Sequence, residues 1–327
     1  MDMFKDKRVL FVTTKNLDYL RNTQEIALLK KMAENVHVIG SHKKSYPARL
    51  IHVYWQLLRY PKKQFDQVFV GFAPQLVLPF FKWKFKDKGI GIDFFISVYD
   101  TLVFDRKKFK VNSIAAKMLK WIDTITIQAA DHVISDTKAH GSYFIEEFGL
   151  SADKLQVLYL EADQSIYYPR EQEKPERMKN RFTVLYFGSV LPLQGLDVIL
   201  DAVDSLKGNK DLYFVIIGPI DENYHKPQSD TVEYHDWLSQ KELAGYINNA
   251  DLCLAGHFNK DINKAKRTIP GKAYIYAAME KPMILGDNPA THELYKEDMP
   301  GIYFVEMGDS KALADTILMI AKKEEIA

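Results

Sequence analysis

Short apolar runs alternate along almost the whole chain with stretches in which hydrophobic residues recur every three or four positions. The short runs predict buried strands, whereas the spacing of three and four predicts helices with one apolar face. Ile26, Leu29 and Ala33 mark such a helix between the apolar runs at 9–12 and 36–39. This order predicts a β-α-β unit with parallel strands.

The same alternation predicts the remaining elements. Further strands are expected at 67–72, 92–98, 133–135, 155–159, 183–187, 212–217, 252–255, 283–285 and 302–305. Helices are expected at 111–129, 137–148, 239–248, 270–280 and 310–323, and around Leu196, Ile199, Leu200 and Val203, which share one face. Strands that alternate with helices are typical of parallel sheets covered on both faces, so the predicted fold class is α/β.

A polar interval divides the pattern into two halves. Residues 161–181 are polar and include Pro169 and Pro175 within a charged run. We therefore predict a Rossmann-like acceptor-side domain at 1–165, a linker at 166–181 and a Rossmann-like ligand-binding domain at 182–327. Doubly wound sheets bind ligands at the carboxyl ends of their strands, so we expect the two domains to face each other across a cleft.

The overall charge narrows the range of partners. The chain has 44 Lys and Arg residues against 43 Asp and Glu residues, so no whole-molecule electrostatic field favours the binding of nucleic acid.

Cys253 lies in an apolar run, which favours a buried hydrophobic residue over a nucleophile. No stretch approaches the roughly 18 apolar residues of a membrane-spanning helix, and the start at 1–8 is polar. We therefore expect a cytoplasmic protein.

Two segments are candidate phosphate sites. Gly188 and Ser189 follow a predicted strand, and Gln194 and Gly195 precede the next helix, whose free N–H groups would suit a diphosphate. The alternative is that the glycines only permit tight turns. Further along, four cations flank Pro270 and Gly271 at a predicted helix start, namely Lys264, Lys266, Arg267 and Lys272. They form either an anion pocket or a solvated basic loop.

A third segment carries carboxylates at the end of a predicted strand. Asp100 and Asp105 follow the run at 92–98, and Arg106 comes next. A carboxylate there could orient an acceptor hydroxyl or stabilise positive charge in a transition state. The alternative is that Asp100 caps a turn and that Asp105 pairs with Arg106.

The ordered motifs resemble those of the retaining glycosyltransferases of family 4. The resemblance covers 184–203, 212–219, 232–251, 269–287 and 312–321 in the second half, and 131–135 and the Asp163, Tyr167 and Pro169 pattern in the first. It implies the GT-B fold and the transfer of a hexose from a nucleoside diphosphate sugar to a glycan or polyprenyl-diphosphate-linked glycan, with retention. It implies no metal and no cofactor beyond that co-substrate, whose base stays open.

The resemblance also assigns roles to residues. The donor phosphates are expected at Gly188, Ser189, Gln194, Gly195, Lys266, Arg267 and Lys272. The nucleotide pocket is expected at Gly218, Pro219, Tyr234, Pro270 and Gly271. The candidate catalytic side chains on the acceptor side are Asp100, Asp105 and Arg106.

Four positions depart from the family pattern. Ser189 and Gln194 stand where the family usually has Arg and Lys. Arg267 and Ile275 stand where the family has paired glutamates, the second of which normally holds the ribose. Fewer cations weaken the stabilisation of a leaving diphosphate unless the basic cluster compensates. A non-catalytic GT-B subunit that binds a partner glycosyltransferase or a glycan is therefore the alternative. A UDP-sugar epimerase would have the same sheet pattern. A dehydrogenase is disfavoured, because no Gly-x-Gly-x-x-Gly motif follows the first predicted strand.

Aromatic and basic residues interleave in two segments of the first half. The run at 80–86 alternates Phe and Trp with lysines, and the segment at 49–63 combines Trp55 and Tyr60 with Arg and Lys. Such residues suit an anionic bilayer surface. The resemblance adds that many relatives glycosylate polyprenyl-diphosphate-linked acceptors at the inner membrane face, so we expect peripheral attachment there. The alternative is that the aromatic rings are core and the lysines only extend outward.

Overall fold

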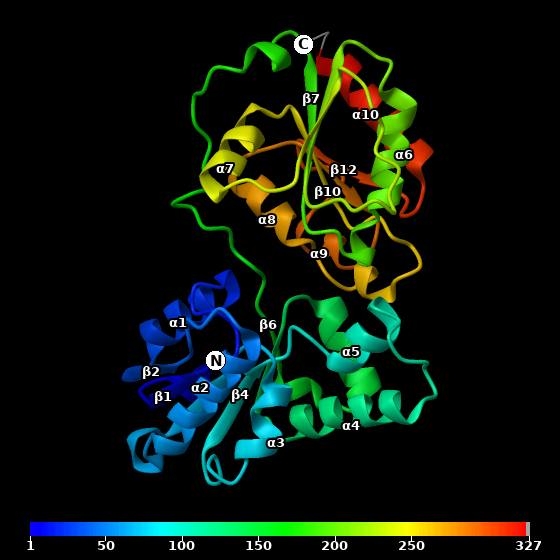
Figure 1. Ribbon diagram of the computed structural model, residues 1–327. Coiled ribbons are helices and arrows are strands. Elements are labelled where there is room, and N and C mark those ends of the chain that lie inside the picture. The colour runs from blue at the N-terminus through cyan, green and yellow to red at the C-terminus, as the bar shows by residue number, and fades with distance from the viewer. Residues whose placement is uncertain (325–327) are drawn as a thin grey trace. The chain divides into compact units, whose positions relative to one another are not determined.

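Two parallel β-sheets, one in each half of the chain, organise the computed structural model, which describes residues 1–324 (Figure 1). The chain divides into two units, Met1–Glu161 and Ala162–Ala327. Each unit holds a six-stranded sheet in which every pair of neighbouring strands is parallel. The predicted α/β class with two doubly wound sheets is confirmed.

The first unit has the strand order β2-β1-β3-β4-β5-β6. Its strands are β1 (Arg8–Val12), β2 (Asn35–Ile39), β3 (Gln67–Val70), β4 (Gly89–Asp93), β5 (His132–Ser135) and β6 (Leu155–Val157). Its helices are α1 (Leu20–Met32), α2 (Tyr46–Arg59), α3 (Leu78–Phe81), α4 (Ile114–Gln128) and α5 (Lys138–Phe148).

Helices cover both faces of this first sheet. Leu29 of α1 packs with Phe11 and Phe69 in one buried cluster. On the opposite face, α2 to α5 share a second and larger cluster, to which they contribute residues such as Val53 and Phe144. Because β2, β3, β4, β5 and β6 succeed one another in the same direction across the sheet, right-handed crossovers place α2 to α5 on a single face.

The second unit has the strand order β12-β11-β10-β7-β8-β9. Its strands are β7 (Phe182–Phe187), β8 (Leu212–Ile217), β9 (Val232–His235), β10 (Leu252–Gly256), β11 (Met283–Gly286) and β12 (Ile302–Val305). Its helices are α6 (Leu196–Leu206), α7 (Gln240–Asn249), α8 (Gly271–Ala278), α9 (Thr291–Leu294) and α10 (Ser310–Glu324).

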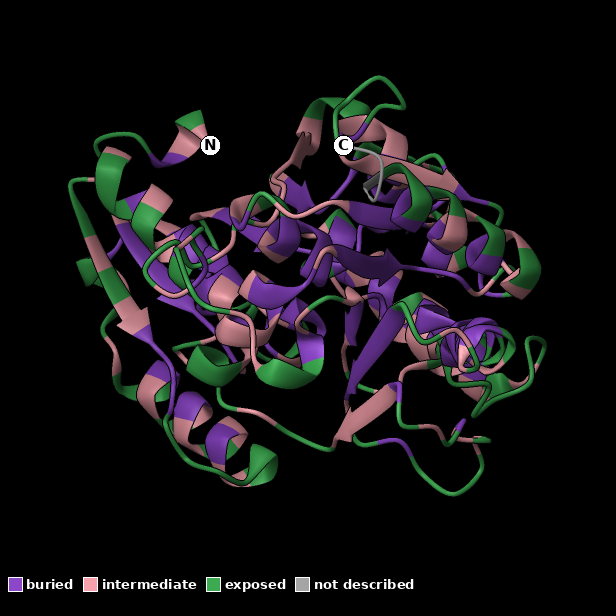
Figure 2. Cartoon of the chain, turned by 90° about the horizontal axis from the view of Figure 1, so that it is seen from above, coloured by how far each residue is buried: buried purple, intermediate pink, exposed green. Residues whose placement is uncertain are grey.

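The core of the second unit explains its continuous apolar strands. Figure 1 shows α7 and α8 on one side of the sheet and α6 and α10 on the other. Sandwiched between these layers, β8 is buried at all six of its positions. The strands are largely buried in both units, while loops and outer helix turns are exposed (Figure 2). This burial is typical of parallel sheets, whose strands have no solvated face.

Helices α2, α3 and α9 were not predicted from the sequence, and two strands also differ from the predictions. The strand expected at 92–98 is β4 at Gly89–Asp93, because the following apolar residues leave the sheet and Phe94 packs against Phe144 at 5.0 Å. The strand Val232–His235 was not predicted, since only its first and third residues are apolar or aromatic. Among residues 1–324, no helix combines the length and the apolar content that crossing a bilayer requires.

The segment predicted as a linker, 166–181, lies within the second unit. Lys174 Nζ pairs with Asp251 Oδ2 at 2.5 Å, and the Arg177 guanidinium pairs with Glu233 at 2.7 Å. Met178 is fully buried. The polar composition of this segment reflects ion pairs and an exposed outer surface rather than an unattached chain.

Candidate functional site

Glycine-bearing loops meet at the carboxyl ends of neighbouring strands in the second unit. Gly188 follows β7 and Gly218 follows β8, which are paired along their length. A Cβ atom at Gly218 would lie 2.2 Å from the carbonyl oxygen of Gly188, so only glycine allows this approach. The carboxyl edge of a parallel sheet is where such folds bind ligands.

Lys272 lies in the first turn of α8, which begins at Gly271 with Pro270 as its N-cap. Its side chain is buried, and its Nζ donates a hydrogen bond to Gln194 Oε1 at 2.7 Å. The same Nζ lies 3.9 Å from the ring centroid of Tyr186 on β7. The start of α8 and the turn before α6 therefore converge on the end of β7.

The polar groups around Gly188 have few partners within the protein. No carboxylate of residues 1–324 forms an ion pair with Lys272, and burial lowers the pKa of this lysine well below its usual value. The hydroxyl of Tyr186 is buried without a hydrogen-bond partner. A Cβ atom at Gly188 would lie 3.1 Å from Lys272 Nζ and 3.2 Å from that hydroxyl. Buried polar groups are normally satisfied, so this arrangement suits an anionic ligand at Gly188.

Gly195 forms the turn that brings Gln194 to Lys272. It adopts φ +67° at the N-cap of α6, and a Cβ atom there would lie 2.7 Å from the backbone nitrogen of Asn259. Gly195 therefore has the turn-forming role that the sequence left open for both glycines. Ser189, by contrast, is exposed.

The basic cluster before α8 separates in the structure. Lys266 ends a short 3-10 helix, Asn263–Lys266, and is exposed, while Lys264 and Arg267 are half-buried. Of the four cations only Lys272 is buried. The prediction that all four cations converge on this helix start is corrected for Lys266, which is exposed at the end of the short 3-10 helix.

The predicted nucleotide-pocket residues also occupy different surroundings. Gly218 and Pro219 follow β8, and Pro219 is exposed. Tyr234 lies on β9, packs against the core under α6 and donates a hydrogen bond to the Pro227 carbonyl at 3.0 Å. Burial raises the pKa of Tyr234 to about 12. This tyrosine therefore belongs to the core rather than to the loop at Gly218.

In the first unit, a buried aspartate shapes the turn that carries the candidate carboxylates. Asp123 of α4 accepts hydrogen bonds from Ser97 Oγ at 2.7 Å and from the backbone nitrogen of Tyr99 at 2.8 Å. Ser97 Oγ in turn accepts from the backbone nitrogen of Asp100 at 2.9 Å. Burial raises the pKa of Asp123, although these donors oppose the shift. The turn is thus held from beneath by α4.

Asp100 and Asp105 begin and end a six-residue π-helix, Asp100–Asp105. Both carboxylates are buried, with 2% and 6% of the residue surface exposed. Arg106 extends outward, and its Nε lies 4.0 Å from Asp105 Oδ2. The pairing that the sequence left open for Asp105 is therefore present, and Arg106 is the exposed member of the three.

A buried polar cluster lies at the carboxyl edge of the same sheet and was not predicted from the sequence. Arg21 of α1 donates from Nε to Asp93 Oδ2 at 3.0 Å, and Glu25 lies 3.4 Å from the same Nε. Burial, and next the charge of Asp93, raise the pKa of Glu25 well above its usual value. Beside this cluster, His140 Nδ1 lies 2.7 Å from Asp136 Oδ1.

The sequence contains part of the information that predicts this buried polar cluster. Asp93 and Asp136 each stand at the end of a strand, and Arg21 and Glu25 are four residues apart on one helix. What the spacing does not show is that α1 turns this pair inward.

In the part of the chain that the structure describes, no group of three or more His, Cys, Asp or Glu side chains could hold a metal ion.

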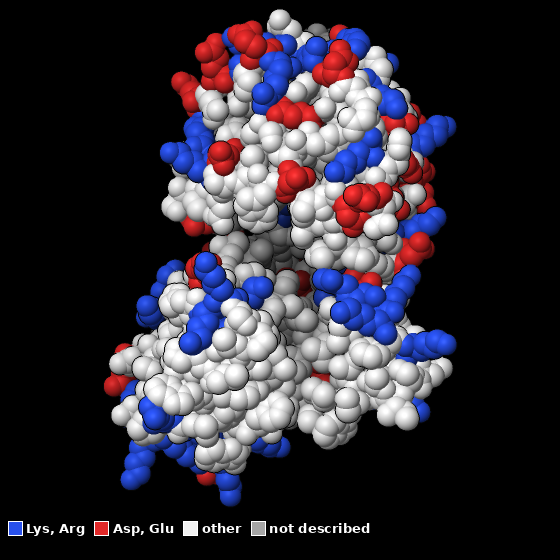
Figure 3. Space-filling view, viewed as in Figure 1, with Lys and Arg blue, Asp and Glu red and all other residues white. Residues whose placement is uncertain are grey.

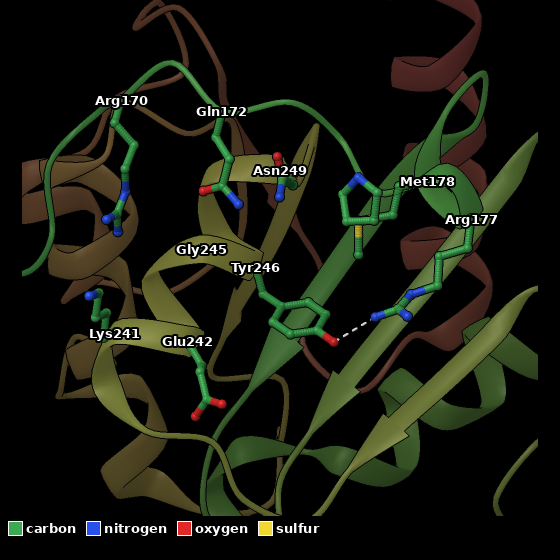
Figure 4. A pocket seen from close by; sticks show the side chains of 10 residues that line it. Arg170, Gln172, Arg177, Met178, Lys241, Glu242, Gly245, Tyr246 and Asn249 are labelled. Carbon is green, nitrogen blue, oxygen red and sulfur yellow. Dashed lines mark hydrogen bonds between the residues drawn. The ribbon is translucent and has the colours of Figure 1, made fainter.

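A cavity of about 420 Å³ lies elsewhere on the second unit, between residues 170–178 and α7 (Figure 4). Met178 precedes β7 and Asn249 ends α7 before β10, so the cavity is near the amino ends of these strands. Arg177 donates to the Tyr246 hydroxyl at 2.7 Å beside it. Lys272 and Gly188 lie at the opposite ends of the strands, so we do not assign this cavity to the candidate site.

Comparison with known proteins relates the second unit to glycosyl transferases. Residues 181–323 match the family described as Glycosyl transferases group 1. An uncharacterized 41.2 kDa protein in the cps region of Klebsiella pneumoniae is 22% identical over 60% of this chain and 54% of its own. An MMP alpha-(1->4)-mannosyltransferase of Mycolicibacterium hassiacum is 26% identical over 37% of this chain and 30% of its own. The chain therefore matches about half or less of the length of these relatives.

Solved structures extend the likeness to the whole chain. Sucrose-phosphate synthase from Thermosynechococcus elongatus gives a TM-score of 0.68 at 11% identity, over 98% of this chain and 90% of that one. Anabaena Alr3699/HepE in complex with UDP gives 0.64 at 13% identity, over 97% and 91%. The chain thus has the two-domain α/β fold of the GT-B glycosyltransferases, and residues 181–323 of its second unit match the glycosyl transferases group 1 model.

Proposed function

From the glycosyl transferases group 1 domain at 181–323, we propose that this protein transfers a hexose from a nucleoside diphosphate sugar to a glycan or polyprenyl-diphosphate-linked glycan, with retention. The observation that carries the proposal is the buried Lys272 ammonium beside Gly188, which has no carboxylate partner among residues 1–324. A diphosphate would supply the missing negative charge. The UDP complex of the Anabaena protein, which has the same fold, is in keeping with such a donor.

The mechanism would rest on positioning and on charge. As the bond between the donor's anomeric carbon and its phosphate oxygen breaks, negative charge develops on the leaving diphosphate, and the Lys272 ammonium stabilises it. Gln194 holds this ammonium in place through its side-chain oxygen. The acceptor hydroxyl oxygen forms the new bond to the anomeric carbon and passes its proton to the leaving diphosphate oxygen, and Asp100 or Asp105 would orient that hydroxyl. The cleft shared by donor and acceptor stays a prediction.

The departures from the family pattern bear on how strongly the donor binds. Lys272 compensates for one of the two missing cations, because its Nζ occupies the space beside Gly188. The exposed Ser189 supplies no cation, and the half-buried Ile275 offers no hydrogen bond to a ribose. These two positions favour a non-catalytic GT-B subunit that binds a partner glycosyltransferase or a glycan as the second candidate.

A thermal-shift panel with UDP, GDP, ADP and dTDP separates the two candidates. A ligand that binds only the folded state at about 100 times its dissociation constant adds about 2.7 kcal/mol of stability. For a unit of this size, the melting temperature should rise by about 5–10 °C with the correct nucleotide. The responding nucleotide sugar, carrying a labelled hexose, should then label a glycolipid extract.

Each alternative has its own signature in this experiment. If no nucleotide raises the melting temperature, the transferase proposal is wrong and the non-catalytic subunit is favoured. Release of a free sugar isomer without any acceptor would instead indicate an epimerase. The cofactor and localisation predictions, no cofactor beyond the co-substrate and a cytoplasmic protein, stay proposals.

A further inference from the structure

Helix α2 has two apolar faces, and only one of them is needed by the core. Val53 and Leu57 are fully buried against the sheet. On the outer side, Ile51, Trp55 and Leu58 are 68%, 48% and 60% exposed. Their spacing of four and three residues aligns them on one face of the helix. The guanidinium of Arg59 lies 3.8 Å from the centroid of the Trp55 ring on this outer face.

Helix α4 repeats this arrangement with the same spacing. Ala116 and Ile127 are buried in the core. Ile114, Met118 and Trp121 form the outer stripe and are 88%, 55% and 59% exposed. Two helices that each present an apolar stripe with a tryptophan to solvent are not explained by the packing of the unit. Scattered single apolar residues are normal on a surface, whereas aligned ones mark an interaction site.

The short helix α3 joins the two stripes. Phe80 and Trp83, at its carboxyl end, are 60% and 63% exposed. Tyr54 of α2 packs against Phe80 and Phe81 with ring centroids 5.9 Å and 5.0 Å apart. α3 also packs against α4, and all three helices cover one face of the first sheet. We name this outer surface the α2–α3–α4 face, made of Ile51, Trp55, Leu58, Phe80, Trp83, Ile114, Met118 and Trp121.

Positive charge is concentrated around this face. Residues 43–63, 78–88 and 106–121 hold six, four and six Lys or Arg residues, and Asp87 is their one acidic residue. Because the whole chain has a net charge of +1, the rest of the molecule is acidic. All of these cations except Arg49 and Lys84 reach the surface. Figure 3 shows the first unit, in the lower part of the view, as a broad uncharged surface with Lys and Arg at its margins and little Asp or Glu.

We propose that the α2–α3–α4 face docks on an anionic lipid bilayer, with its apolar side chains in the interface and its lysines against the headgroups. Trp and Phe rings flanked by Lys suit the boundary between headgroups and acyl chains. Lysines interleave with the apolar residues, as at Lys82-Trp83 and Lys117-Met118. A protein partner is less suited, because the centres of protein interfaces are depleted of lysine. The inference does not depend on the transfer activity.

The structure also corrects which lysines can contact lipid. Lys84, within the aromatic run at 80–86, is 5% exposed, and its Nζ donates to the Leu58 carbonyl at 3.3 Å. Burial lowers its pKa. Lys84 therefore ties α3 to α2, whereas Lys82 and Lys86 are exposed and free to meet headgroups.

Sedimentation of the full-length protein with vesicles tests the proposal. Vesicles of phosphatidylcholine alone are compared with vesicles in which about a third of the lipid is phosphatidylglycerol, with no nucleotide or sugar present. Two variants remove the proposed contacts, W55S/W83S/W121S and K82Q/K86Q/K117Q. Two matched controls in the second unit are W237S, at a position 84% exposed, and K311Q/K322Q/K323Q on α10.

The wild-type protein should sediment with the anionic vesicles and not with the neutral ones. The lysine variant should bind the anionic vesicles about 100-fold more weakly, and the tryptophan variant should lose binding at least as strongly. Both controls should bind as the wild type does. All variants should keep the wild-type melting temperature, because the replaced side chains are exposed.

Three results would overturn the proposal. The first is sedimentation of both test variants equal to that of the wild type. The second is equal binding of the wild type to neutral and anionic vesicles. The third is a wild-type dimer by light scattering that the tryptophan variant converts to a monomer, with no vesicle binding, which would assign the face to a second copy of this chain. None of these results would alter the nucleotide response by which the transferase proposal is tested.

Discussion

Lys272 is the residue whose surroundings are best explained by a ligand. Its ammonium is buried against the Tyr186 ring and, among residues 1–324, donates a side-chain hydrogen bond only to Gln194 Oε1. A buried lysine without a counter-charge costs stability, and burial accordingly lowers its pKa. The folded protein releases the Lys272 proton at a lower pH than the unfolded chain does. The loss of stability caused by burying this charge is therefore greatest below the lowered pKa, and it disappears as the pH rises toward the usual pKa of a free lysine, about 10.4.

Replacing Lys272 by Met should therefore separate stability from function. We expect the melting temperature of K272M at neutral pH to equal or exceed that of the wild type, since the buried charge is gone. The increase in melting temperature with nucleotide should be lost, and kcat/KM should fall by about 100-fold. Melting curves with and without nucleotide, together with a transfer assay, measure these changes.

Lys266→Met is the matched control for this prediction. Lys266 is exposed and lies six residues before Lys272, so its loss should leave both the nucleotide response and kcat/KM near the wild-type values. A K272M protein that kept the full nucleotide response, or a K266M protein that lost it equally, would show that the ammonium at α8 is not the phosphate ligand.

At the scale of elements, helix α1 is anchored to the carboxyl edge of the first sheet by polar contacts. Arg21 binds Asp93 at the end of β4 and also donates to the Leu158 carbonyl, and Gln24 donates to the Tyr159 carbonyl at 2.7 Å. Glu25 completes the cluster as a buried carboxyl group. One helix thus connects the end of β4 to the residues that follow β6.

The protonation of Glu25 makes this anchor sensitive to pH. Burial and the charge of Asp93 raise its pKa in the folded state, so the folded protein binds a proton that the unfolded chain releases. The contribution of this bound proton to the free energy of unfolding is fully present below the usual pKa of Glu, about 4.3. It is lost as the pH rises through the raised pKa that Glu25 has in the folded state. The wild-type free energy of unfolding should fall by up to about 1.4 kcal/mol per pH unit over that interval.

Glu25→Gln should remove this part of the pH dependence, because the amide stays neutral at every pH. Urea unfolding of E25Q between pH 4 and 9 should give a flatter stability profile than the wild type. Glu34→Gln, an exposed substitution just beyond α1, is the control and should follow the wild-type profile. Parallel profiles for E25Q and the wild type would contradict the raised pKa.

At the scale of the whole molecule, each unit has its own sheet and its own core. The second unit includes residues 162–181. The ion pairs of Lys174 with Asp251 and of Arg177 with Glu233 attach this segment next to β10 and to β9, the hydrogen bond from Arg177 to Tyr246 attaches it to α7, and Met178 is buried. This attachment gives the unit a boundary near residue 162 rather than 182. Its stability should depend on where a fragment is cut.

A fragment of residues 162–327 should unfold cooperatively and respond to the same nucleotide as the full chain. A fragment of 182–327 lacks Met178 and both ion pairs, so its free energy of unfolding should be lower by at least about 2 kcal/mol. Urea unfolding of the two fragments measures this difference. Equal stabilities would mean that residues 166–181 are only a linker, as their composition predicts.

Much of the architecture is readable from the chain itself. The predominantly apolar runs at 183–187 and 212–217 are β7 and β8 almost to the residue, because a strand buried on both faces is largely apolar. The edge strand Val232–His235 escaped prediction because edge positions are only half-buried and accept polar residues. The apolar run after β4 suggested a longer strand, which the turn held by Asp123 ends early.

The sequence by itself determined the α/β class, the two sheets and the positions of Gly188 and Lys272 next to strand or helix ends, because periodicity and turn chemistry act over a few neighbouring residues. Only the tertiary structure decided that Lys272 is buried while Lys266 is exposed, and that Lys84 turns inward while Lys82 does not. It also brought Arg21 to Asp93 and placed α2 and α4 on the same face of the first sheet. These outcomes depend on which distant elements pack together, and the spacing of residues within one element does not predict those contacts.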